Sequence, residues 1–140
     1  MATRSRIGIL NEDGTITSIY CHWDGYPSNN GRILNENYGT ETSVREMLSL
    51  GDLSSLDKNL HPKGEHTFKE PESGCCVFYG RDRGDSDCDS TESKNLEEFL
   101  FISQACEYVY VFDAHEWFCT RLYGEDQKML RINEAREKWT

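Results

Sequence analysis

The sequence predicts a single α+β domain, in which a mostly antiparallel sheet of about five strands is covered by helices on one face. Strand-type runs joined by turn residues occur near both ends of the chain, at residues 4–23 and 108–123, and a further apolar strand lies at 75–79. Helix-type segments with capping signals lie between them. The chain of 140 residues is long enough to bury one core. We expect the domain to span residues 1–123 and residues 124–140 to form a helical tail.

The first strand-type region predicts a β-hairpin. Its segment Asn11-Glu12-Asp13-Gly14 is typical of a type I turn closed by a left-handed glycine, which places Asn11 opposite Thr15. In that register Arg6 pairs with Tyr20, and paired residues share one face of the sheet. The apolar face, which we expect to join the core, then contains Ile7, Ile9, Ile19, Cys21 and Trp23.

Two short helices are expected after this hairpin. The first runs through residues 32–38 behind a cap at Asn29 or Asn30. The second begins at a capping box formed by Ser43 and Glu46. Both segments place apolar residues at helical spacing, so each helix is expected to cover the sheet.

The second half of the chain alternates polar segments with regular elements. Residues 57–74 and 80–94 are polar and predict loops on either side of the apolar strand, which we expect to be central in the sheet. Asn95 and Glu98 predict the capped start of a helix. A second hairpin is expected within residues 108–123.

The charge balance limits the classes of partner. Twenty-five acidic and fifteen basic residues give a net charge of −10, which repels nucleic acids and anionic membranes. We therefore expect neither as a partner. The chain also lacks an apolar run of membrane-spanning length and a signal-type N-terminus, which favours a cytoplasmic protein with reduced thiols at its six cysteines.

The polar face of the first hairpin is the strongest candidate site. Its two guanidinium groups, phenol and imidazole could hold a phosphate or carboxylate, and its carboxylate could orient a cation or accept from a ribose hydroxyl. The alternative is an ordinary solvated sheet face, because strand alternation alone produces such faces. The residues of this candidate ligand-binding site are Arg4, Arg6, Tyr20, His22 and Asp24.

Three further residues are candidate ligand contacts. Tyr26 follows the hairpin and could stack on a ligand or cover the end of the sheet. Arg81 and Arg83 belong to a glycine-containing loop after a strand, and such loops contact phosphates or partner proteins. The pair His22 and Asp24 also leaves a small hydrolase or phosphoesterase open, although we assign no catalytic residue.

No metal site or cofactor is expected. Asp85, Asp87 and Asp89 imitate the start of a calcium-binding loop, but Ser90 replaces the glycine at its sixth position and Leu96 the acid at its twelfth. The cysteines and histidines lack the paired spacing of a zinc site. An acidic surface loop is therefore the better interpretation.

Several motifs resemble a family of small tailed-bacteriophage and prophage proteins. They are the N-terminal Thr3-Arg4-Ser5-Arg6-Ile7-Gly8-Ile9, the segment Cys21-His22-Trp23-Asp24-Gly25-Tyr26-Pro27 and the later Tyr79-Gly80-Arg81-Asp82-Arg83-Gly84. The likeness covers most of residues 3–123 and supplies no catalytic residues. It implies a phage accessory protein that acts in the infected bacterial cytoplasm, where such proteins counter host defence by holding a signalling nucleotide or blocking a host protein.

Three functional hypotheses follow. The first is a non-catalytic protein that sequesters a small anionic, nucleotide-derived ligand and so counters host defence. The second is an acidic inhibitor that docks on a basic surface of a host protein through the loop carrying Asp85, Asp87, Asp89 and Glu92. The third is the small hydrolase or phosphoesterase. The expected partner is a small anionic ligand or a host protein, and the sequence leaves a homo-oligomer open.

Overall fold

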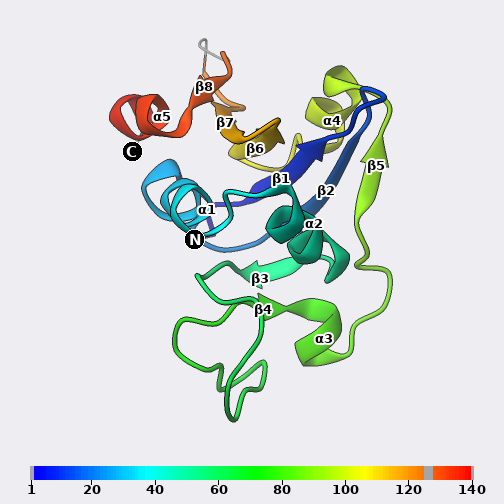
Figure 1. Ribbon diagram of the computed structural model, residues 1–140, viewed down its shortest axis with the longest axis vertical. Coiled ribbons are helices and arrows are strands. Elements are labelled where there is room, and N and C mark those ends of the chain that lie inside the picture. Colours follow the sequence, from blue (N-terminus) through cyan, green and yellow to red (C-terminus); the bar gives the residue numbers. More distant parts are fainter. Residues whose placement is uncertain (1, 125–127, 140) are drawn as a thin grey trace.

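One mixed β-sheet forms the centre of the structure (Figure 1). The computed structural model describes residues 2–124 and 128–139. Within these residues eight strands pair in the order β4-β3-β2-β1-β6-β7-β8, and β5 pairs with β2. In chain order the strands are β1 (Ser5–Leu10), β2 (Ile16–Cys21), β3 (Leu53–Ser55), β4 (Val77–Phe78), β5 (Thr91–Ser93), β6 (Tyr108–Asp113), β7 (Glu116–Arg121) and β8 (Leu130–Arg131).

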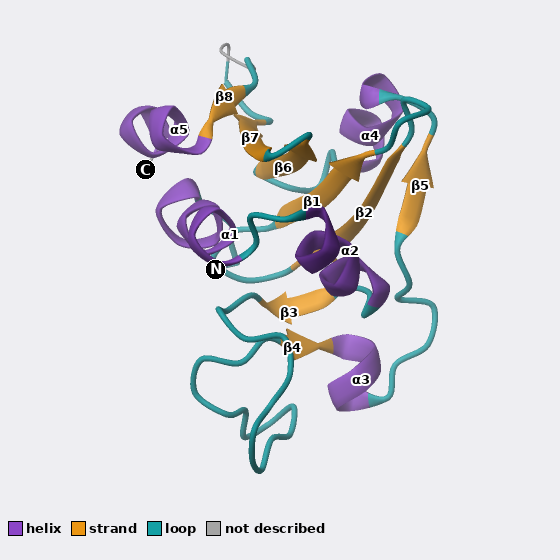
Figure 2. Cartoon of the chain, viewed as in Figure 1, coloured by secondary structure: helices purple, strands orange, loops and turns teal. Residues whose placement is uncertain are grey.

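Short helices connect these strands (Figure 2). A π-helical turn, η1, precedes α1, and Pro27 rather than Asn29 or Asn30 begins it, because the fixed φ of proline suits the first helical position. The capping box of α2 uses Thr40 with Ser43, three residues earlier than the predicted pair of Ser43 and Glu46. The helical elements are η1 (Pro27–Gly31), α1 (Arg32–Asn37), α2 (Glu41–Ser49), α3 (Tyr79–Arg83), α4 (Leu96–Ile102) and α5 (Ile132–Trp139).

The predicted register of the first hairpin is confirmed. Arg6 pairs with Tyr20, and the Asn11 N–H donates to the Thr15 carbonyl oxygen at 2.8 Å. Gly14 has a φ of 89°, the left-handed conformation that the turn requires. The predicted cap of α4 is also confirmed, because the Asn95 side chain accepts from the Glu98 N–H.

The predicted α+β class is confirmed, but the sheet differs from the expected five mostly antiparallel strands. β1 pairs in parallel with β6, and β2 pairs in parallel with β3, so the two hairpins lie side by side. The strand expected to be central supplies only β4, at one end of the sheet. The segment expected to be the loop 80–94 contains most of α3 and all of β5. Strands of two or three residues are too short to produce a recognisable periodic pattern.

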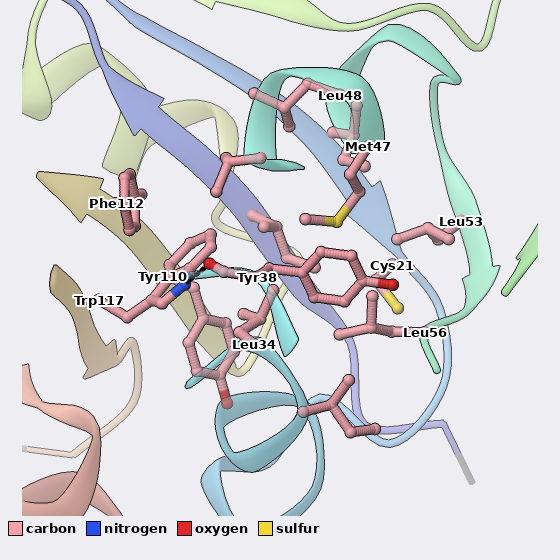
Figure 3. Close-up of a cluster of buried hydrophobic side chains, with 14 of the residues drawn as sticks. Cys21, Leu34, Tyr38, Met47, Leu48, Leu53, Leu56, Tyr110, Phe112 and Trp117 are labelled. Carbon is pink, nitrogen blue, oxygen red and sulfur yellow. Dashed lines mark hydrogen bonds between the residues drawn. The ribbon is translucent and has the colours of Figure 1, made fainter. Parts of the chain in front are cut away.

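Helices cover both faces of the sheet, not one as predicted. Tyr110 belongs to the main core with side chains from α1 and α2 (Figure 3), and α5 adds side chains to the same core. Its neighbours Val109 and Val111 point to the opposite face, where they pack with Ile16 and with Phe99 of α4. Two separate apolar clusters therefore enclose the sheet. The side of the first hairpin predicted to be polar is the one that α4 partly covers.

The C-terminal segment contributes to the main core. Of the predicted helical tail at 124–140, residues 125–127 and 140 lie outside the described residues. In the remainder, β8 pairs with β7, and α5 buries Ile132, Ala135 and Trp139. None of the described helices combines the length and apolar character needed to cross a lipid bilayer.

Candidate functional site

Arg6 is the central residue of the candidate site. It lies in β1 opposite Tyr20, and its Nε donates to the Ser18 hydroxyl oxygen at 2.9 Å. Partial burial lowers the pKa of Arg6, although the nearby Asp52 and Cys106 act in the opposite direction. The guanidinium remains charged at any physiological pH. No described residue accepts a hydrogen bond from either of its Nη groups, so these donors are available to an anion.

Tyr20, the cross-strand partner of Arg6, forms a hydrogen-bonded pair with His22. The Tyr20 hydroxyl and His22 Nδ1 are 2.8 Å apart. Burial raises the pKa of Tyr20 to about 12, with the Cys106 thiol adding to the increase and the charge of Arg4 opposing it. The phenol is therefore protonated at neutral pH and can donate. The His22 imidazole also meets the Trp23 ring edge-on, with centroids 4.8 Å apart.

Asp52 belongs to the same site but was not among the predicted residues. It stands at the outer edge of β2, between the parts of that strand paired with β5 and with β3. Its Oδ1 accepts from the Tyr20 N–H at 2.8 Å. Burial raises the pKa of Asp52, while that hydrogen bond and the charge of Arg6 lower it. Its role depends on the β2–β3 pairing, for which the sequence offers no local signal.

Asp24 and Trp23 do not lie where the predicted alternation places them. The N–H groups of His22 and Trp23 both donate to β3 carbonyls, although successive N–H groups of a regular strand point in opposite directions. The regular strand therefore ends at Cys21. Trp23, predicted in the core, is 43% exposed. Asp24 is exposed with a φ of 54°, and no hydrogen bond or ion pair joins it to His22 in the described part of the chain.

Arg4 lies at the margin of the site. Its side chain is exposed, and Nη1 reaches the Ala105 carbonyl at 3.4 Å. Its backbone N–H donates to a carboxylate oxygen of Glu107 at 2.6 Å. Arg4 therefore contributes charge near Tyr20 rather than a second fixed guanidinium beside Arg6.

The other candidate contacts have partners within the protein. Tyr26 packs against the main core, on the face opposite Arg6. The Arg81 guanidinium donates to the carbonyl groups of Leu60 and Cys76 and to Asp82. Arg83 pairs with Asp85 and stacks against the rings of Phe68 and Tyr79, with centroid distances of 4.6 and 4.8 Å. The structure thus does not bring these three residues to Arg6.

The cluster brings together groups that can bind an anion and its neighbouring hydroxyl groups. It combines an immobilised guanidinium, a protonated phenol, an imidazole and a carboxylate whose pKa is raised. All six cysteines are free thiols, and burial raises the pKa of the nearest one, Cys106, to about 11, so it is not an activated nucleophile. Within residues 2–124 and 128–139, no three His, Cys, Asp or Glu side chains are grouped to hold a metal ion. Comparison of the chain with protein-family models, curated proteins and solved structures finds no match.

Proposed function

We propose that the protein is a non-catalytic binding protein for a small anionic ligand, of nucleotide-derived chemistry, held at Arg6. The observation that carries this proposal is the fixed guanidinium of Arg6. Ser18 holds its Nε, while both Nη groups lack a protein acceptor among the described residues. A guanidinium presents parallel N–H donors that match a phosphate or carboxylate, and little further ordering is needed when its orientation is already set.

The neighbouring side chains would select among anions. On the same face of the first hairpin, Tyr20 and His22 supply a donor and two rings, which suit a base or ribose attached to the bound phosphate. Asp52 would repel a bare, highly charged anion. It would accept from a hydroxyl or amino group placed next to the charged one, the role first expected of Asp24.

The setting of this binding is part of the proposal. The resemblance of residues 3–123 to small phage proteins supports an accessory role in the cytoplasm of an infected bacterium, where sequestering a ligand would counter host defence. The third hypothesis, a hydrolase using His22 with Asp24, loses support because the two side chains are not joined. The inhibitor hypothesis concerns another surface of the protein.

Binding is testable by titration calorimetry against cyclic mono- and dinucleotides and ADP-ribose. We expect at least one to bind, and Arg6→Ala to weaken that binding about tenfold or more, which corresponds to roughly 1.4 kcal/mol. Arg6→Lys should recover only part of the loss, because an ammonium lacks the paired N–H donors. Ser18→Ala, which releases Nε, should weaken binding less than Arg6→Ala.

Arg32→Ala is the matched control, since Arg32 is a surface arginine of α1 paired with Glu36. It should leave binding unchanged. Circular dichroism of each variant checks that the fold is retained. The proposal fails if none of these ligands binds, or if Arg6→Ala binds as tightly as the unmodified protein.

A further inference from the structure

Helix α4 exposes several large apolar side chains, which is unusual for a helix on a protein surface. Of its seven residues, only Phe99 is fully buried. Phe101 is 66% exposed, Leu96 42% and Ile102 37%. A surface helix normally carries polar residues at its outward positions. Contiguous exposed apolar patches of this kind mark interaction sites in soluble proteins.

Two hollows extend this surface across neighbouring strands. One, of about 390 Å³, is lined by Leu100 and Phe101 of α4 and by Leu122 after β7. The other, of about 230 Å³, is lined by Leu96 of α4 with Met129 and several strand residues. Leu100, Leu122 and Met129 all pack on the same buried cluster, so the two hollows belong to one surface. We call this surface the α4 face, defined by Leu96, Leu100, Phe101, Leu122 and Met129.

The margin of the α4 face is acidic. Glu97 lines the first hollow and Asp113 the second, and both are exposed. Within the described residues neither carboxylate has an ion-pair partner. The whole chain carries a net charge of −10. The face therefore presents an apolar centre with two unpaired carboxylates at its margin.

We propose that the α4 face is a docking surface for a basic amphipathic helix of a partner protein. The apolar stripe of such a helix would pack against the exposed Phe101 side chain. Its lysine or arginine side chains would pair with Glu97 and Asp113. A second copy of this chain fits poorly, because it would bring like charges together. The α4 face is separate from the site at Arg6. The β1 residue that lines one of its hollows is Leu10, at the far end of the strand and four residues from Arg6.

The location differs from that of the inhibitor hypothesis drawn from the sequence. That hypothesis placed the contact on the acidic loop carrying Asp85, Asp87 and Asp89. In the structure Asp85 is neutralised by Arg83. The α4 face adds what that loop lacks, an apolar centre from which a partner can exclude water.

A synthetic peptide tests the proposal directly. The probe is an 18-residue helix of leucine and lysine in amphipathic order, and its fluorescence anisotropy is followed as the protein is added. We expect binding, with no binding of the same peptide carrying glutamate in place of lysine. Phe101→Ala should weaken binding at least tenfold, and Glu97→Gln should weaken it and reduce its dependence on salt.

Trp23→Ala is the matched control, because Trp23 is another large exposed aromatic residue outside the α4 face. It should leave peptide binding unchanged, as should Arg6→Ala, which separates this proposal from the proposed function. If Phe101→Ala has no more effect than Trp23→Ala, the peptide is held by net charge alone and the proposal is overturned. It is also overturned if sedimentation equilibrium shows self-association that Phe101→Ala abolishes, since the face would then bind a second copy.

Discussion

Replacement of Trp117 by alanine is expected to lower the free energy of unfolding by about 3–5 kcal/mol. Trp117 is 2% exposed and packs against Phe112 in the main core, with ring centroids 5.1 Å apart. Its Nε1 donates to the Tyr38 carbonyl oxygen at 2.7 Å, which fastens the end of α1 to β7 (Figure 3). The alanine variant would leave both a cavity and a buried carbonyl without its donor.

Urea denaturation followed by far-UV circular dichroism measures this loss. Trp23→Ala removes the same side chain from an exposed position and is expected to change the free energy of unfolding by no more than about 0.5 kcal/mol. Trp117→Phe retains most of the ring and should lose less than Trp117→Ala. Equal losses for Trp117→Ala and Trp23→Ala would contradict the assignment of Trp117 to the core.

The first hairpin contains both a confirmed prediction, its register, and a wrong one, the burial of Trp23. The register of the first hairpin was predictable because a short turn with a left-handed Gly14 fixes the pairing locally. The prediction that Trp23 joins the core is wrong, because the alternation of side chains between the two sheet faces stops at Cys21. The end of that strand depends on β3, which joins from a distant part of the chain.

Non-local pairing explains the other differences. Nothing in the local pattern indicates that β1 pairs in parallel with β6, because this contact joins segments about 100 residues apart, as the Ser5–Tyr108 pair shows. When the two hairpins lie side by side, both faces of the sheet carry apolar side chains that must be buried. Helix α4 covers the second face. Arg6 and Tyr20 could be placed together from the turn alone. Asp52 could not, because only the β2–β3 pairing brings it to Tyr20.

The second large effect is expected at Asp82, where alanine should lower the free energy of unfolding by about 3–5 kcal/mol. The Asp82 side chain is only 6% exposed. It accepts from the Phe78 N–H at 2.8 Å and from Arg81 Nε at 2.9 Å. His66 Nε2 lies 3.2 Å away, and His66 Nδ1 accepts from the Glu72 N–H. Removal of the carboxylate would leave the Phe78 N–H without its acceptor and Arg81 without its ion-pair partner, and would weaken the hold of α3 on the 57–74 segment.

The pH dependence of stability distinguishes this network from simple packing. Burial alone would raise the pKa of Asp82, but the hydrogen bonds from Arg81 and the Phe78 N–H, together with the nearby His66 imidazole, outweigh burial and lower it. A group with a lowered folded-state pKa stabilises the fold fully above its ordinary value, about 3.9, and loses that contribution as pH falls through the folded-state value. The stability difference between the unmodified protein and Asp82→Asn should therefore be largest near neutral pH and shrink below about pH 4.

Asp24→Asn is the control for this experiment, because Asp24 is exposed and its left-handed backbone also accommodates asparagine. Its effect on the free energy of unfolding should stay within about 0.5 kcal/mol. A difference between the unmodified protein and Asp82→Asn that is the same at pH 7 and pH 3 would show that shape rather than charge matters at position 82. The arginine and histidine beside it would then be packing neighbours, and the anchoring of residues 57–74 would have to come from the backbone hydrogen bonds that join Asn59 to Gly74 and Cys76.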